Sequence, residues 1–338
     1  MGVKDSKAKE YISDNERFSD LCNYVLFDGA KIIDPNELVE KDTTEVLSIF
    51  GIDQKQIILQ KWRDILKNVT IKYTGGMYVV LIGIENQTDV HYAMPVKSMI
   101  YDALSYGQQI NEAKKIHARE KDYESSAEFL SGFSKKDKLT PVITITVYLG
   151  IDKWDGPKSL YEMLGDVDEK ILPFVSDYKI NLVEPGEITD FTKFKTGLRQ
   201  LFEILKNGSD MKKIDAVLKS DTAFTAIDAE TAAVINMFSG LDLKVEEKDE
   251  VVDMCKAWED QKECGRIEGR IEGRTAGRIE GRMEGRIEER IEIISRFLQN
   301  GGTKEDAKRM LAVSDEDIIM AEKQLVLLKE TAASTSYN

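Results

Sequence analysis

Apolar and polar positions follow two different spacings along the chain, and the change between them predicts where helices and strands lie. Residues 8–27 carry apolar side chains at a helical spacing, and the glycine of FDGAK closes the run. Residues 61–87 contain two runs rich in β-branched side chains on either side of Thr-Gly-Gly at 74–76. The first segment therefore predicts a helix and the second a β-hairpin.

The next segments extend this pattern into an α/β domain. Residues 94–120 have the spacing of an amphipathic helix with Pro95 in its first turn. Residues 140–150, TPVITITVYLG, are β-branched with few charges and predict a central strand. Residues 172–185 predict a strand near the sheet edge, and residues 191–239 have helical patterns. We expect a central sheet flanked by helices.

The composition changes beyond this region. Residues 241–264 are strongly acidic, and we place the domain boundary at their start. The predicted organisation is a domain at 1–240, an acidic linker or helix at 241–264, a repeat helix at 265–290, a small helical module at 291–330 and a disordered tail at 331–338.

The repeat reads GRIEGRIEGRTAGRIEGRMEGRIEER, with Gly-Arg-Ile-Glu recurring every four residues, close to one helical turn. Each interior glycine costs a helix about 1 kcal/mol relative to alanine, so packing against another helix must compensate. The prediction is a homo-oligomer formed through the repeat and the C-terminal helices. A flexible charged linker is one alternative, and a protease-tag sequence left by cloning is another, which the imperfect copies disfavour.

Composition narrows the class of protein. Hydrophobic residues make up 42% of the 338 positions, enough for a sizeable core, and no apolar run is long enough for a membrane helix. The polar N-terminal sequence lacks a secretory signal, so the expectation is a cytoplasmic protein without a membrane partner. Three cysteines suggest neither a disulfide framework nor a zinc site. A net charge of -14 argues against nonspecific polyanion binding.

Two carboxylates are the candidate metal-binding groups of the sequence. A hairpin turn near residue 75 pairs positions whose numbers sum to about 150, so Asp64 and Glu85 face each other at the open end. Paired carboxylates repel unless a cation or shared proton lies between them, and hard oxygen ligands suit Mg²⁺ or Mn²⁺. The backbone carbonyl of Asn86 is a candidate third ligand. The alternative is that both acids merely end strands and are solvated.

The chain also resembles a known family in FSDLCNYVLFDG, WRDILK, YVVLIGIENQTDVHYAMPVKSMIYDALSYGQQI and PVITITVYLG followed by WDGPKSL. These stretches, across about residues 16–240, are similar to the Rpn family of recombination-promoting nucleases, also described as YhgA-like transposases. The resemblance implies the restriction-endonuclease-like core of the PD-(D/E)XK nucleases. In that superfamily's pattern, Asp64 matches the aspartate, Glu85 the second acid and Gln87 the position that usually holds lysine.

Two positions depart from that pattern. Gln87 lacks the positive charge of lysine and can only orient a water through hydrogen bonds, and Arg63 stands where proline is usual.

Further residues are candidates for the same site. Asp20, and after it Glu16, are candidates for an additional acidic residue in the metal shell. Lys97 and Tyr101 are candidate DNA phosphate contacts, although surface solvation of Lys97 and core packing of Tyr101 are the plainer interpretations.

The resulting hypothesis is an Mg²⁺-dependent endonuclease that cuts double-stranded DNA in recombination, transposition or defence against foreign DNA. Asp64 and Glu85 would hold the metal, and Gln87 would orient the water. The alternative is a catalytically decayed nuclease fold that acts as a self-associating scaffold, which Gln87 and the acidic charge favour. The two histidines, at 91 and 117, have no GxSxG motif nearby, and Walker and Rossmann glycine patterns are absent.

Overall fold

The chain divides into two compact units, Met1–Glu259 and Asp260–Asn338. The first is an α/β unit with a mixed five-stranded sheet, as the sequence predicts, and the second is helical. Among the residues described, no helix is long and apolar enough to cross a membrane. This computed structural model describes residues 2–41, 44–48, 58–73, 76–244 and 250–335.

The five-stranded sheet has the order β1-β4-β5-β6-β7. Its first three strands are antiparallel, while β5, β6 and β7 run parallel to one another. The strands are β1 (Leu38–Glu40), β4 (Ile65–Tyr73), β5 (Gly76–Gln87), β6 (Val142–Tyr148) and β7 (Asn181–Val183). Two separate antiparallel pairs join β2 (Thr44–Ser48) to β3 (Ile58–Trp62) and β8 (Ile227–Asp228) to β9 (Val251–Val252).

The predicted hairpin is β4–β5, and its register is confirmed. Ile65 lies opposite Ile84, so Asp64 and Glu85 follow directly at the open end of the ladder. Two residues of the predicted turn, Thr74 and Gly75, lie outside the described residues. The sheet therefore delivers the two acids to one place, as the sequence predicts.

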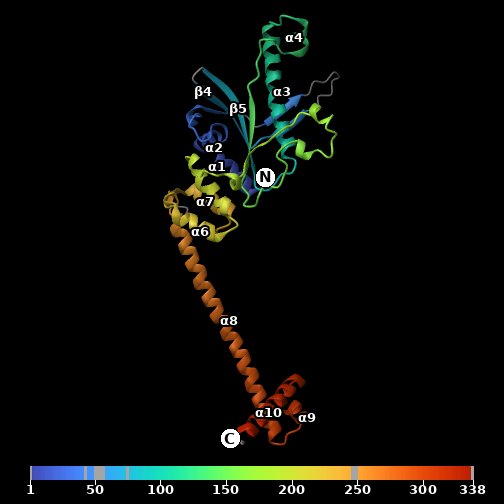
Figure 1. Cartoon of the computed structure of the whole chain (residues 1–338), viewed down its shortest axis with the longest axis vertical. Coiled ribbons are helices and arrows are strands. Elements are labelled where there is room, and N and C mark those ends of the chain that lie inside the picture. The colour runs from blue at the N-terminus through green and yellow to red at the C-terminus, as the bar shows by residue number, and fades with distance from the viewer. Residues whose placement is uncertain (1, 42–43, 49–57, 74–75, 245–249, 336–338) are drawn as a thin grey trace. The chain divides into compact units, whose positions relative to one another are not determined.

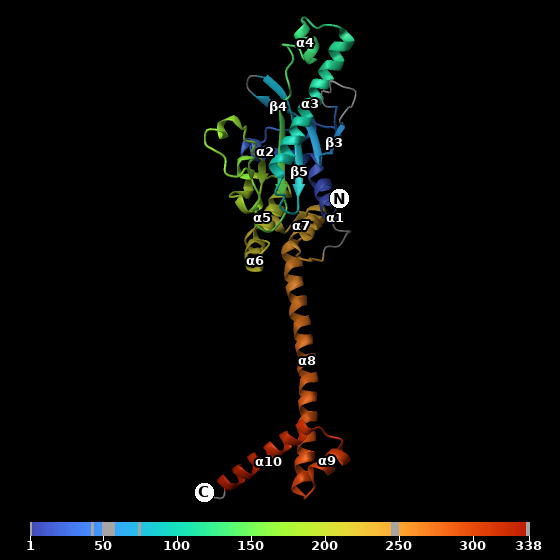
Figure 2. The same ribbon diagram turned by 90° about the vertical axis from the view of Figure 1, so that its right-hand side faces the viewer.

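Helices cover both faces of the sheet. In Figures 1 and 2, α3 runs alongside the sheet, with α4 beyond its C-terminal end. The large apolar core on the other face joins the sheet to α1, α2, α5 and α7. The helices of this unit are α1 (Val3–Ser13), α2 (Asn15–Phe27), α3 (Met94–Glu120), α4 (Ser126–Ser131), α5 (Leu198–Asn207), α6 (Met211–Ser220) and α7 (Ala229–Ser239), and short 3₁₀ turns lie at Pro35–Glu37, Tyr161–Met163, Leu172–Phe174, Pro185–Glu187, Phe191–Lys193 and Thr222–Phe224.

The single helix predicted over residues 8–27 is two helices that meet at Asp14. Asp14 has an extended backbone, and its carboxylate accepts the Arg17 N–H, which starts α2. The buried Lys67 ammonium stabilises the break, because it donates to the Ser13 carbonyl and to Asn15 Oδ1, both at 2.5 Å. A tertiary contact therefore divides a segment whose local pattern is continuous.

The first unit extends to Glu259, past the domain end predicted at 240. Leu241, Leu243, Val252 and Trp258 are buried in its core, so the segment after α7 belongs to the fold. The second unit contains most of α8 (Met254–Gln299), with α9 (Lys304–Leu311) and α10 (Asp315–Thr335). The whole repeat lies in α8, and α10 runs into the tail predicted to be disordered.

A buried arginine joins the hairpin to its neighbours. The Arg63 side chain has no exposed surface and donates to Thr144 Oγ1 on β6 at 2.6 Å. It also donates to Asp102 Oδ1 and Ser105 Oγ on α3, at 3.1 and 3.2 Å. A buried charge must be paired and hydrogen-bonded, so this network fixes the chain immediately before Asp64.

Replacing Gly83 by alanine should test this network. A Cβ at Gly83 would lie 2.2 Å from Arg63 Nη1, and the hydrogen bonds of Arg63 leave the guanidinium little room to move. We expect Gly83→Ala to lower the free energy of unfolding by about 1–3 kcal/mol in urea denaturation. In the control Gly165→Ala, a Cβ meets no atom within 4 Å. Equal stability of the two variants would contradict the proposed constraint.

Candidate active site

The candidate site lies at the C-terminal end of β5, beside the parallel strand β6. Successive side chains of a strand point to opposite faces, so Glu85 and Gln87 lie on one face and Asn86 on the other. Glu85 is 1% exposed and Asn86 5%. A buried strand thus ends in three polar side chains.

Two hydrogen bonds hold Asp64 against this strand end. The Asn86 N–H donates to Asp64 Oδ2 at 2.9 Å, and the Asp64 N–H donates to Glu85 Oε1 at 3.3 Å. Each carboxylate is therefore oriented by the other strand's backbone. The arrangement leaves Asp64 Oδ1 without a hydrogen bond among the described residues, so this oxygen is available to a ligand.

Lys97, in the first turns of α3, supplies a positive charge at the site. Its Nζ lies 3.0 Å from Glu85 Oε2. The sequence predicted Lys97 as a phosphate contact, and the structure brings it to the Glu85 carboxylate and to a cavity that Asp64 also lines. Gln87 stands at the strand position where lysine is usual. The ammonium group of Lys97, from α3, lies near this position instead.

The other predicted phosphate contact, Tyr101, is buried. It is 4% exposed, and its ring lies under the Arg63 guanidinium, with a ring centroid distance of 5.0 Å. The Lys97 ammonium is 5.8 Å from the same ring. The structure thus does not support a DNA contact by Tyr101, which instead packs beside the two cations.

Burial favours the protonated form of both carboxylates, Asp64 and Glu85. The pKa of Glu85 is raised to about 7, mainly by desolvation and also by the nearby charge of Asp64, while Lys97 opposes the shift. Desolvation also raises the pKa of Asp64, against the hydrogen bond from the Asn86 N–H and the positive charge of Lys97. Two acids in this state would gain stability from a cation placed between them.

A cavity of about 300 Å³ opens beside these groups. Asp5 of α1, which sequence reasoning missed, contributes a further carboxylate to it and accepts a hydrogen bond from Thr88 Oγ1 at 3.3 Å. Asp5 shares a helix face with the buried Ala8 and Ile12, at spacings of three and seven, and this pattern was the available signal. The lining residues are Asp5, Asp64, Asn86, Gln87, Thr88, Asp89, Val90, His91 and Lys97.

The acids that sequence analysis chose from the first helices have other positions. The Asp20 carboxylate accepts the N–H groups of Lys195 and Thr196 and the Thr196 hydroxyl, at 2.7–3.0 Å. It therefore holds the segment before α5 and does not line the cavity. Glu16 is exposed in the first turn of α2. A place for Asp20 in the metal shell is not supported.

The donor set fits Mg²⁺ or Mn²⁺. Nowhere in the described ranges do three or more His, Cys, Asp or Glu side chains gather closely enough to hold a metal ion. Mg²⁺, however, commonly uses one or two carboxylates and completes its shell with water and substrate phosphate. Asp64, Glu85 and the Asn86 carbonyl supply such a set, although Gln87 Nε2 already donates to that carbonyl at 2.7 Å.

The Asn86 side chain lies on the face of β5 opposite to Glu85 and Gln87. Both its oxygen and its nitrogen are buried without a hydrogen-bond partner in the described part of the chain. Because both atoms are inaccessible, a molecule in the cavity would not reach them, and the unsatisfied amide costs the fold about 1–3 kcal/mol.

Comparison of the chain with protein-family models, with curated proteins and with solved structures finds no match.

The pKa of Glu85 predicts a pH dependence of stability. The folded pKa of about 7 exceeds the ordinary 4.5, so the stabilisation is complete below pH 4.5 and is lost as the pH rises through 7. Across this window the free energy of unfolding should fall by on the order of 3 kcal/mol more for the parent chain than for Glu85→Gln. Metal-free urea unfolding at several pH values measures this difference. Parallel pH profiles of the two chains would refute the assignment.

Proposed function

We propose that this chain is an Mg²⁺- or Mn²⁺-dependent endonuclease that hydrolyses phosphodiester bonds of double-stranded DNA. The observation that carries the proposal is the pair Asp64 and Glu85, held together by backbone hydrogen bonds with Lys97 beside them. The sheet supports it, because an antiparallel hairpin is followed by a helix and a parallel strand. That order agrees with the restriction-endonuclease-like core implied by the resemblance to the Rpn family. The same resemblance implies roles in recombination, transposition or defence against foreign DNA.

The carboxylates of Asp64 and Glu85 and the Asn86 carbonyl would hold the metal. A bound Mg²⁺ or Mn²⁺ supplies a Lewis acid for the phosphodiester and lowers the pKa of its water. Gln87 positions the Asn86 carbonyl through its amide N–H, while its Oε1 can accept a hydrogen bond from the attacking water.

Lys97 would change partners when substrate binds. Its ammonium now neutralises Glu85 at 3.0 Å, and a cation at the carboxylates would take over that role. Lys97 could then contact a phosphate oxygen of the DNA, which stabilises the charge that develops there. In this way α3 supplies the positive charge that the strand position of Gln87 lacks.

A catalytically decayed fold that acts as a scaffold is the second candidate. Gln87 has no charge, its amide is already hydrogen-bonded within the chain, and Lys97 neutralises Glu85 without a metal. Calorimetric titration of the purified protein with Mn²⁺ separates the candidates. A nuclease must bind the metal, and Asp64→Asn should weaken that binding. A decayed fold does not need to bind the metal.

Removing either acid should abolish metal-dependent cleavage. We expect Asp64→Asn and Glu85→Gln each to lower Mg²⁺-dependent nicking or cutting of plasmid DNA by about 10²-fold or more, because each removes a metal ligand. Glu16→Gln, an exposed acid on α2, is the matched control and should keep full activity. Cleavage at the parental rate in either of the first two variants would refute the site.

The position of the lysine can be tested by moving it. Lys97→Met should lower cleavage by roughly 10²-fold, because the site loses its positive charge. Adding Gln87→Lys to that variant should restore much of the rate, since the new ammonium extends from the same face of β5 as Glu85. The single variant Gln87→Lys should keep or raise activity. Full activity of Lys97→Met would show that this lysine has no part in the reaction.

A further inference from the structure

The repeat in α8 is exposed along its whole length. Every residue from 265 to 290 is exposed, and no contact among the described residues requires glycine at these positions. A Cβ added at any of the six would meet no atom within 4 Å, so alanine would fit and would favour the helix by about 1 kcal/mol at each position. These glycines are Gly265, Gly269, Gly273, Gly277, Gly281 and Gly285.

Most charges of the repeat also lack ion-pair partners among the described residues, apart from Arg266 with Glu263 and Arg290 with Asp317. Like charges recur at four-residue intervals, which places arginine next to arginine and glutamate next to glutamate on the helix surface, and such pairs destabilise a helix. Within the described residues, no ion pair reaches the five arginines Arg270, Arg274, Arg278, Arg282 and Arg286, nor the glutamates Glu268, Glu272, Glu280, Glu284 and Glu288.

The helix geometry shows which partner helix places opposite charges beside both the arginine row and the glutamate row. At 100° per residue, the arginine row lies on one side of the glycine row and the glutamate row on the other. The isoleucine row, on the opposite side of the helix from the glycines, also has the arginine row on one side and the glutamate row on the other. When two such helices pair in parallel about a two-fold axis, arginines of each face glutamates of the other. In an antiparallel pair, arginines face arginines.

We propose that this helix pairs in parallel and in register with the same helix of a second copy of the chain. Charge complementarity between the arginine and glutamate rows sets the orientation. The exposed apolar row supplies surface to bury, since its side chains are 39–63% exposed. This row consists of Ile267, Ile271, Ile279, Met283 and Ile287.

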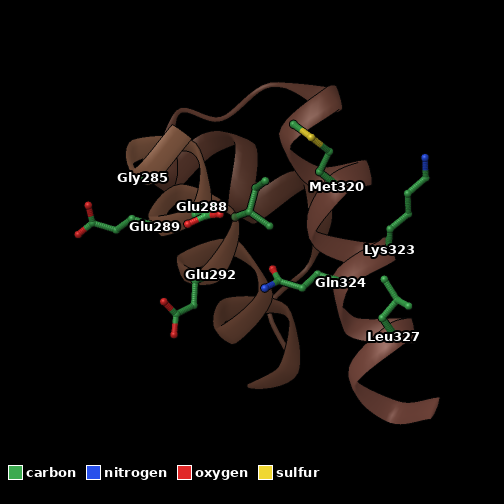
Figure 3. Close-up of a pocket in the computed structure, with 9 residues that line it drawn as sticks. Gly285, Glu288, Glu289, Glu292, Met320, Lys323, Gln324 and Leu327 are labelled. Atoms are coloured by element: carbon green, nitrogen blue, oxygen red, sulfur yellow. The ribbon is translucent and has the colours of Figure 1, made fainter. Parts of the chain in front are cut away.

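The groove between α8 and α10 continues this surface. It has a volume of about 660 Å³, and Figure 3 shows Glu288, Glu289 and Glu292 on α8 and Met320, Lys323 and Gln324 on α10. The wall formed by residues 285–292 is acidic because of Glu288, Glu289 and Glu292. Parallel pairing in register brings Arg286 of the second copy to Glu288, so the charge complementarity extends into the groove.

The orientation has a consequence that rests on the proposed function. In a parallel pair, both N-terminal units leave from the same end of the paired helices, so two nuclease sites belong to one assembly. A double-strand break requires a cut in each strand, and two sites can supply both. Association itself needs neither metal nor DNA, so its failure and failure of the nuclease assignment are distinguishable.

Distances between spin labels test the orientation in the full-length chain. One variant, Cys255→Ser, is labelled at the native Cys264, just before the repeat; the remaining Cys22 is buried. The other, Cys255→Ser with Cys264→Ser and Gln299→Cys, is labelled at the end of α8. A parallel pair places both label pairs at a helix separation of about 10 Å plus the label arms.

An antiparallel pair centred on the repeat would separate the two Cys264 positions by about 40 Å along the axis, at 1.5 Å per residue. Short distances in both variants are the expected result. A long distance in either one, or a monomer mass in sedimentation velocity, overturns the proposal.

Charge reversal gives an independent test with its own control. An acidic variant carries Arg270, Arg274, Arg278 and Arg282 changed to Glu, and a basic variant carries Glu268, Glu272, Glu280 and Glu284 changed to Arg. Each alone should sediment as a monomer, and a mixture of the two should restore a one-to-one complex. Unchanged helicity by circular dichroism shows that each variant is folded. Self-association of either variant alone, or no complex in the mixture, refutes the role of the charge rows.

Discussion

The buried charge of Arg63 is the constraint on which the α/β unit depends. Its guanidinium lies inside the sheet and helix layers, so it must find acceptors there, and they come from β6 and α3. These contacts place α3 against the hairpin and fix the residue just before Asp64. Only glycine at position 83 leaves room for the guanidinium beside β5. The site is therefore set by a core interaction that itself has no part in the chemistry.

Burial also makes ionisation of the two acids, Asp64 and Glu85, costly. Glu85 is nearly inaccessible, so its charge is costly, and the ammonium of Lys97 offsets part of that cost. Asp64 is partly buried and is held by a backbone N–H. A site that keeps two desolvated carboxylates together gains from any cation that enters.

The hairpin and its register were predictable because they follow from local sequence, and once Ile65 pairs with Ile84 the positions of Asp64 and Glu85 are determined. Asp5 and Lys97 reach the site from helices, where position depends on how each helix packs. Asp20 seemed suited to the site for the same local reasons, yet its carboxylate holds a segment 175 residues away along the chain. The break at Asp14 likewise depends on Lys67, which no pattern within residues 8–27 reveals.

The two units differ in how many of their charged groups find partners within the same chain. In the first, Arg63, Lys67 and Asp20 all find partners within the molecule, so intramolecular contacts account for their positions. In the repeat, glycines without neighbours and rows of like charge each raise the free energy of a solitary helix. The rows of like charge would become favourable beside a second helix with the same sequence in the same direction, as we propose. In such a pair the period of four would encode an orientation, because a helix that carries opposite charges on its two flanks is complementary to a parallel copy of itself.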